Sequence, residues 1–105
     1  MQEISPEEAA TLMQQDDVVL IDVREPAELE AAAVAGALHI PMNDVPARID
    51  EIDKEKTVLV LCHLGGRSAQ VAMYLLSNGY ENVINVAGGI SAWAADHDPS
   101  VVKDQ

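Results

Sequence analysis

The sequence has few of the residues that cross-link secreted proteins or fill aromatic cores. Among its 105 residues are one cysteine, two tyrosines, one tryptophan and no phenylalanine. A single cysteine excludes an internal disulfide and an internal resolving thiol, and it fits a reducing compartment better than an oxidising one. The core is therefore expected to consist of aliphatic side chains.

Long apolar runs are also missing. No stretch reaches the roughly 18 apolar residues of a transmembrane helix, and the first residues lack the basic and then apolar profile of a secretory signal. We therefore expect a cytoplasmic protein, or a domain of a larger one. The length and the 49% hydrophobic content suffice for one core. The sequence predicts a single domain over residues 1–105, with a frayed tail at 101–105.

Basic residues are scarce. Six Lys and Arg stand against 18 Asp and Glu, which gives a formal net charge of −12. Such a charge disfavours nucleic acid and anionic membranes as partners. It would also repel an anionic substrate at long range, so only the local field of a binding site could offset that repulsion.

Short apolar runs alternate with amphipathic segments along the whole chain. Strands are expected at residues 18–21, 38–40, 57–61 and 83–86, and helices at 5–14, 25–33, 43–52, 69–78 and 91–95. Ser5 and Glu8 are expected to form a capping box at the first helix, with Pro6 at its first position, and Asn43 is the expected cap of the third. This order predicts an α/β fold with a mainly parallel sheet and helices on both faces.

The only cysteine occupies a special place in this pattern. Cys62 follows the apolar run 57–61, and two glycines, Arg67 and Ser68 lead into the next helix. Open parallel sheets place ligand sites at the carboxyl ends of their strands. Loop amides, the helix dipole and Arg67 would lower the pKa of a thiol there. A lone cysteine is usually a buried small hydrophobe, but this context predicts that Cys62 is an activated nucleophile.

Three sequence blocks carry a family resemblance, and they span nearly the whole chain. They are Leu20–Pro26 with Glu28, Gly36–Ala37 and Ile40–Pro41; Cys62–Ser68; and Val86–Ile90 with Trp93. The chain resembles a single-domain rhodanese, a sulfurtransferase. The middle block, Cys-x-x-Gly-x-Arg-Ser, is the most specific. The resemblance implies a rhodanese-like fold of five mainly parallel strands, with no cofactor and no metal.

The resemblance also implies a mechanism. Cys62 would take the outer sulfur of a donor such as thiosulfate, and the resulting persulfide would pass that sulfur to cyanide or a thiol. The loop residues His63, Leu64, Gly65, Gly66 and Ser68 would bind the persulfide and the donor. Arg67 would add charge for the donor or brace the loop.

Other interpretations compete with this one. The same persulfide could serve a sulfur-relay or sensing module that hands sulfur to a basic partner protein, or the domain could be non-catalytic. Cysteine-dependent phosphatases and arsenate reductases are less favoured, because they place five residues between Cys and Arg whereas four stand here, His63 to Gly66.

Several residues have a structural interpretation beside the functional one. Ala32-Ala33 replace a Gly-His pair that many rhodaneses carry, which affects packing more than activity. Arg24 is expected to form ion pairs, for example with Glu28. Asp22 is expected to cap the loop after its strand, Ser68 to cap the helix after Cys62, and His63 to face solvent.

Overall fold

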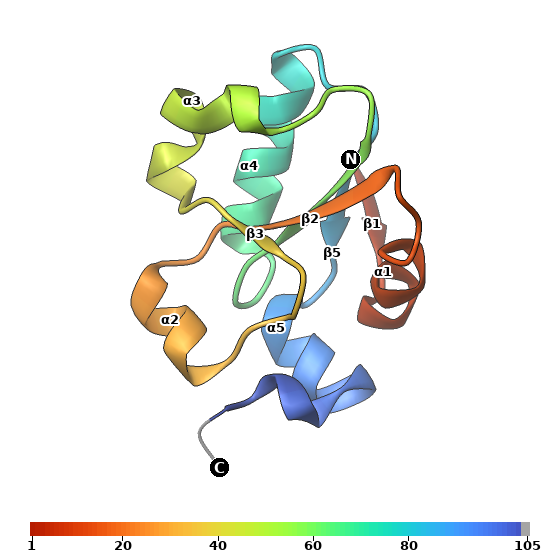
Figure 1. The fold of residues 1–105 in the computed structure, drawn as a ribbon, viewed down its shortest axis with the longest axis vertical. Helices are drawn as coiled ribbons and strands as arrows, with labels where there is room; N and C mark the ends of the chain where they lie inside the picture. The colour runs from red at the N-terminus through yellow and green to blue at the C-terminus, as the bar shows by residue number, and fades with distance from the viewer. Residues whose placement is uncertain (104–105) are drawn as a thin grey trace.

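A five-stranded parallel sheet forms the centre of the molecule (Figure 1). The computed structural model describes residues 1–103. The strands are β1 (Gln2–Ile4), β2 (Val18–Asp22), β3 (Leu38–His39), β4 (Thr57–Leu61) and β5 (Val83–Val86), in the order β1-β5-β4-β2-β3. Every pairing between neighbouring strands is parallel. The predicted α/β class is confirmed. Strand β1 was not predicted, because three residues are too few to show an alternation of apolar and polar side chains.

Helices connect the strands and cover both faces of the sheet (Figure 1). They are α1 (Pro6–Leu12), α2 (Pro26–Ala31), α3 (Val45–Arg48), α4 (Gly66–Ser77) and α5 (Gly89–Ala92). Further helical turns are η1 (Met42–Asp44), η2 (Ile49–Glu51), η3 (Trp93–His97) and η4 (Pro99–Val101). The capping box predicted for α1 is present, because Ser5 and Glu8 each accept the other's main-chain N–H.

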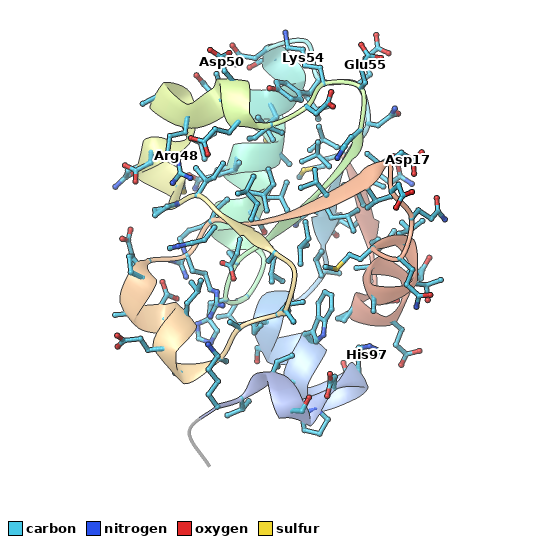
Figure 2. All side chains as sticks on the ribbon, in the orientation of Figure 1. Asp17, Arg48, Asp50, Lys54, Glu55 and His97 are labelled. Atoms are coloured by element: carbon cyan, nitrogen blue, oxygen red, sulfur yellow. The ribbon has the colours of Figure 1, made fainter. Side chains whose placement is uncertain are left out.

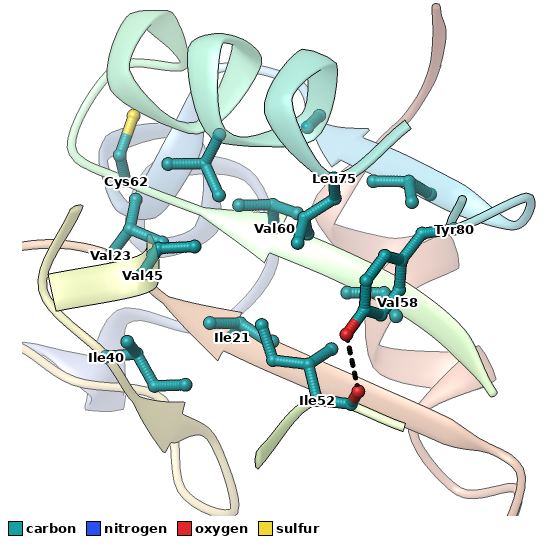
Figure 3. Close-up of a cluster of buried hydrophobic side chains, with 13 residues drawn as sticks. Ile21, Val23, Ile40, Val45, Ile52, Val58, Val60, Cys62, Leu75 and Tyr80 are labelled. Carbon is teal, nitrogen blue, oxygen red and sulfur yellow. Dashed lines mark hydrogen bonds between the residues drawn. The ribbon is translucent and has the colours of Figure 1, made fainter. Parts of the chain in front are cut away.

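Two aliphatic clusters lie on opposite faces of the sheet, because side chains alternate along each strand. Val58 and Val60 of β4 join the cluster under α3 and α4, which Figure 3 shows. Leu59 and Leu61 join the cluster under α1 and α5. Charged side chains such as Asp17 and Glu55 remain at the periphery (Figure 2). Cys62 continues the β4 alternation and faces the α4 side.

Two local predictions are wrong. Asn43 does not cap the third helix, because the Asp44 N–H donates to Pro41 O at 2.8 Å and closes a tight turn before α3 begins. The tail is not frayed as far as residue 103. Val101 is buried, and the Lys103 N–H donates to Ala31 O at 2.8 Å. Residues 104–105 of that prediction lie outside the described part of the chain.

Candidate active site around Cys62

The loop after β4 turns its amides toward the Cys62 sulfur. Gly65 adopts φ +113°, in the left-handed region that favours glycine. In that conformation its N–H donates to Cys62 Sγ at 3.0 Å. Helix α4 therefore begins at Gly66, three residues before the predicted start, and Gly65 occupies the cap position. Figure 3 shows the sulfur directed toward the helix, away from the aliphatic side chains.

Ser68 lies in the first turn of α4 and does not cap it, so that prediction is wrong. Its hydroxyl is 3.3 Å from Cys62 Sγ and also in hydrogen-bonding reach of Asn85 Oδ1. The single hydroxyl proton is donated to one of these acceptors at a time. Ser68 is fully buried, so its hydroxyl contacts groups inside the site and not solvent.

Burial and hydrogen bonding act in opposite directions on the thiol. Burial raises the pKa of Cys62, but the Ser68 hydroxyl and the N–H groups of Ser68, Gly65 and Leu64 outweigh it and hold the pKa below its usual value. Cys62 is only 1% exposed. The Gly65 N–H and the Ser68 hydroxyl thus stabilise the thiolate form of a sulfur that the fold largely covers.

Asn85 of β5 anchors the loop from below. Its amide Nδ2 donates to Gly65 O at 3.2 Å and to Glu3 Oε2 at 2.8 Å, and its Oδ1 lies within hydrogen-bonding reach of the Ser68 hydroxyl. Every polar atom of this buried side chain is therefore used. Sequence reasoning missed Asn85, although a lone amide in the apolar strand Val83–Val86 was a usable signal.

The turn at Gly88 and Gly89, which follows β5, lets the start of α5 hydrogen-bond to the Cys62 loop. The Ile90 N–H donates to Cys62 O at 2.8 Å, and the Ser91 N–H donates to His63 O at 3.1 Å. Gly89 has φ +61°, and a Cβ there would lie 2.4 Å from both of those carbonyl oxygens. With the carbonyls fixed on this side, the loop amides are left to face the sulfur.

Arg67 is engaged by a carboxylate from another element. Its Nη1 and Nη2 each donate at 2.7 Å to one oxygen of Glu28 on α2. Glu28 also accepts the Glu25 N–H at 3.0 Å, which caps α2. The Arg67 hydrogen bond is the main cause that lowers the pKa of Glu28 to about 2. Of the two predicted roles for Arg67, the geometry matches the brace.

Arg24 forms the predicted structural ion pair, but with Asp22 and not with the Glu28 side chain given as the example. It is 2% exposed, and its Nη2 lies 2.8 Å from Oδ2 of the equally buried Asp22. Its Nε also donates to Asp22, and Nη1 and Nη2 donate to the main-chain carbonyls of Glu28 and Ala32. A buried guanidinium requires a partner inside the fold, and Asp22 at the end of β2 is adjacent. Asp22 also accepts the Arg24 N–H, so the predicted loop cap is present.

The remaining loop residues lie at the surface. His63 and Gly66 are exposed, and the Leu64 side chain is 67% exposed.

Within residues 1–103 no three His, Cys, Asp or Glu side chains lie close enough together to hold a metal ion. None of the helices in that range is both long and apolar enough to cross a membrane.

Comparisons with known proteins agree with this geometry. The model of the rhodanese-like domain family matches residues 5–96. A sulfurtransferase of Allochromatium vinosum is 42% identical over 89 residues, covering 85% of this chain and 83% of its own. Thiosulfate sulfurtransferase GlpE of Tolumonas auensis is 43% identical over 90 residues, covering 86% and 85%. The crystal structure of a rhodanese-like domain protein from Staphylococcus aureus superposes with a TM-score of 0.81 at 33% identity, covering 89% and 91%. The chain therefore belongs to the rhodanese-like family and is a sulfurtransferase of the rhodanese type.

Proposed function

We propose that Cys62 is the sulfur-carrying nucleophile and that it accepts sulfane sulfur from a donor such as thiosulfate. The observation that carries this proposal is the set of amides converging on Cys62 Sγ at the carboxyl end of β4. These donors favour the thiolate over the thiol, and the thiolate is the attacking species. Relatives named thiosulfate sulfurtransferase support thiosulfate as a donor.

The reaction divides into two displacements. The Cys62 thiolate attacks the outer sulfur of thiosulfate, a new S–S bond forms, and the donor's S–S bond breaks so that sulfite leaves with the electron pair. The product is a Cys62 persulfide anion. In the second step cyanide attacks the outer persulfide sulfur, thiocyanate departs, and the Cys62 thiolate is restored. A thiol acceptor would take the same sulfur as its own persulfide.

The loop supplies the electrostatic part of catalysis in this proposal. Main-chain amides from His63 to Ser68 would hold the persulfide anion, and those of Leu64, Gly65 and Ser68 already lower the pKa of the thiol. The exposed His63 and Leu64 form the outer side of this loop. The lowered pKa of Cys62 favours the thiolate, and attack by the thiolate needs no proton transfer in the first step.

We extend the proposal to the molecule that accepts the sulfur in the cell. The formal charge of −12 favours a basic protein that would receive the sulfur by salt-sensitive docking. Such a relay uses the same persulfide and differs only in the second step. We place the reaction in the cytoplasm, where a lone reactive thiol stays reduced.

The test is mass spectrometry of the intact protein after incubation with thiosulfate. The wild type should gain the mass of one sulfur atom and should form thiocyanate when cyanide is added. The variant Cys62→Ser should do neither, while its thermal unfolding stays close to that of the wild type. A wild-type protein that gains no sulfur from any sulfane donor would refute the proposal.

A further inference from the structure

The three arginines of this chain are all neutralised by carboxylates. Arg24 pairs with Asp22, Arg48 with Glu51, and Arg67 with Glu28. Arg67 is the one that belongs to the Cys62 loop. Both of its terminal nitrogens are directed at the two Glu28 oxygens, in the bidentate arrangement that gives the strongest carboxylate pair.

This pairing changes the charge that a donor meets. Glu28 stays ionised throughout the neutral range, because its pKa is about 2. The Arg67–Glu28 pair is therefore close to neutral as a unit, and Glu25 adds a further negative charge close enough to act on Arg67. A donor at Cys62 is met by main-chain amides without a free guanidinium, in a protein of net charge −12.

Donor charge decides how much this arrangement matters. Thiosulfate brings two negative charges, so it suffers twice the electrostatic penalty of a singly charged donor at the same distance. A persulfide on an uncharged carrier thiol brings at most one negative charge. The loop amides already stabilise the negative charge of the Cys62 thiolate, so every charge that a donor adds raises the demand on the same few groups.

We propose that Glu28 is a specificity-determining residue, which occupies Arg67 and so favours persulfide donors of low charge over dianionic thiosulfate. This inference rests on the proposed function and names its donor class. With a persulfide RS–SH, the Cys62 thiolate attacks the outer sulfur and the donor's S–S bond breaks. RS⁻ then leaves with the electron pair, so Cys62–S–SH and RS⁻ balance the reactants.

The experiment compares sulfur loading of the wild type and Glu28→Gln with two donors. The donors are thiosulfate and the persulfide of 2-mercaptoethanol, which carries at most one charge. Loading of Cys62 is followed by quenching and intact mass in a single turnover, so the acceptor step does not contribute. The substituted amide would keep an oxygen for the Glu25 N–H while removing the charge that occupies Arg67.

The expected result is a larger gain for the dianion. If freeing Arg67 speeds loading about threefold for one donor charge, the gain for two charges is about tenfold, because electrostatic free energies scale with donor charge. The ratio of the two rate constants should therefore shift about threefold toward thiosulfate. A change in loop stability or in the Cys62 pKa would move both donors together and leave that ratio constant.

Two matched variants separate charge at the site from other effects. Glu8→Gln alters the same capping-box position on α1, where no arginine is bound. Glu51→Gln removes the carboxylate of the surface pair with Arg48, which does not involve the Cys62 loop. Both should retain the wild-type donor ratio. An unchanged ratio in Glu28→Gln, or an equal shift in either control, overturns the role of Glu28. Failure of the wild type to load from either donor would instead overturn the proposed function.

Discussion

Replacing Gly89 with alanine should disturb the Cys62 loop without touching any side chain of the site. The added Cβ would lie 2.4 Å from Cys62 O and His63 O, a distance that real Cβ contacts do not show. Both obstructing atoms belong to main chain, so a side-chain rotation cannot relieve the crowding. The loop and the start of α5 must separate, which breaks the hydrogen bonds that Ile90 and Ser91 donate to those oxygens.

The cost can be added from its parts. An alanine at φ +61° is about 1 kcal/mol less favourable than glycine. Two lost hydrogen bonds cost about 1 kcal/mol each. The expected loss in the free energy of unfolding is therefore about 3 kcal/mol, which leaves a typical domain folded. A displaced loop should also slow sulfur loading of Cys62 by roughly a hundredfold, because small misplacements of reacting groups carry costs of that order.

Gly36→Ala is the matched control. Gly36 has φ +85°, but the nearest atom to an added Cβ is Met13 Cε at 4.0 Å. This variant should therefore lose only the conformational part, about 1 kcal/mol, with normal sulfur loading. Urea unfolding gives the stabilities, and intact mass gives the loading rates. If Gly89→Ala is no less stable than Gly36→Ala, or loads sulfur at the wild-type rate, the start of α5 does not hold the loop.

Two further predictions concern ionisation. Ser68→Ala should raise the pKa of Cys62, because it removes the strongest group that lowers it; a pH titration of thiolate ultraviolet absorbance measures the shift, and an unchanged or lower midpoint would contradict it. The depressed pKa of Glu28, about 2 against an ordinary 4.5, should make its pair with Arg67 stabilising above pH 4.5 and progressively weaker as pH falls toward 2. The partly exposed pair should contribute about 1 kcal/mol at neutral pH, so the stability difference between wild type and Glu28→Gln should shrink in urea unfolding at acid pH. A difference that grows there would reverse the sign of this linkage.

The network around Cys62 extends to the edges of the fold. Asn85 connects the loop to Glu3 of β1, 82 residues away in the chain, and Arg67 connects it to α2, 39 residues away. Such ties reduce the freedom of a glycine-rich loop without adding bulk near the sulfur. They explain how a loop with two glycines keeps several amides directed at one atom.

Local sequence was sufficient for the elements whose causes are local. The apolar run 57–61 forms β4, and α1 begins at Pro6, directly after the capping residue Ser5. The two glycines before Arg67 lie where the loop after β4 leads into α4. These outcomes depend on side-chain period, cap chemistry and backbone freedom, all of which act within a few residues. The same reasoning identified Cys62 at the end of a parallel strand.

Tertiary structure alone decided which partners the charged and amide groups of the site received. Arg24 and Arg67 each had a carboxylate available in the sequence, but the crossover from β2 through α2 gave Glu28 to Arg67 and left Asp22 for Arg24. The pairing of β1 with β5 similarly brought Glu3 to Asn85. Hydrogen bonds act over about 3 Å, whereas Glu28 and Arg67 lie 39 residues apart in the chain and Glu3 and Asn85 lie 82 apart. Only the folded chain determines that these groups meet.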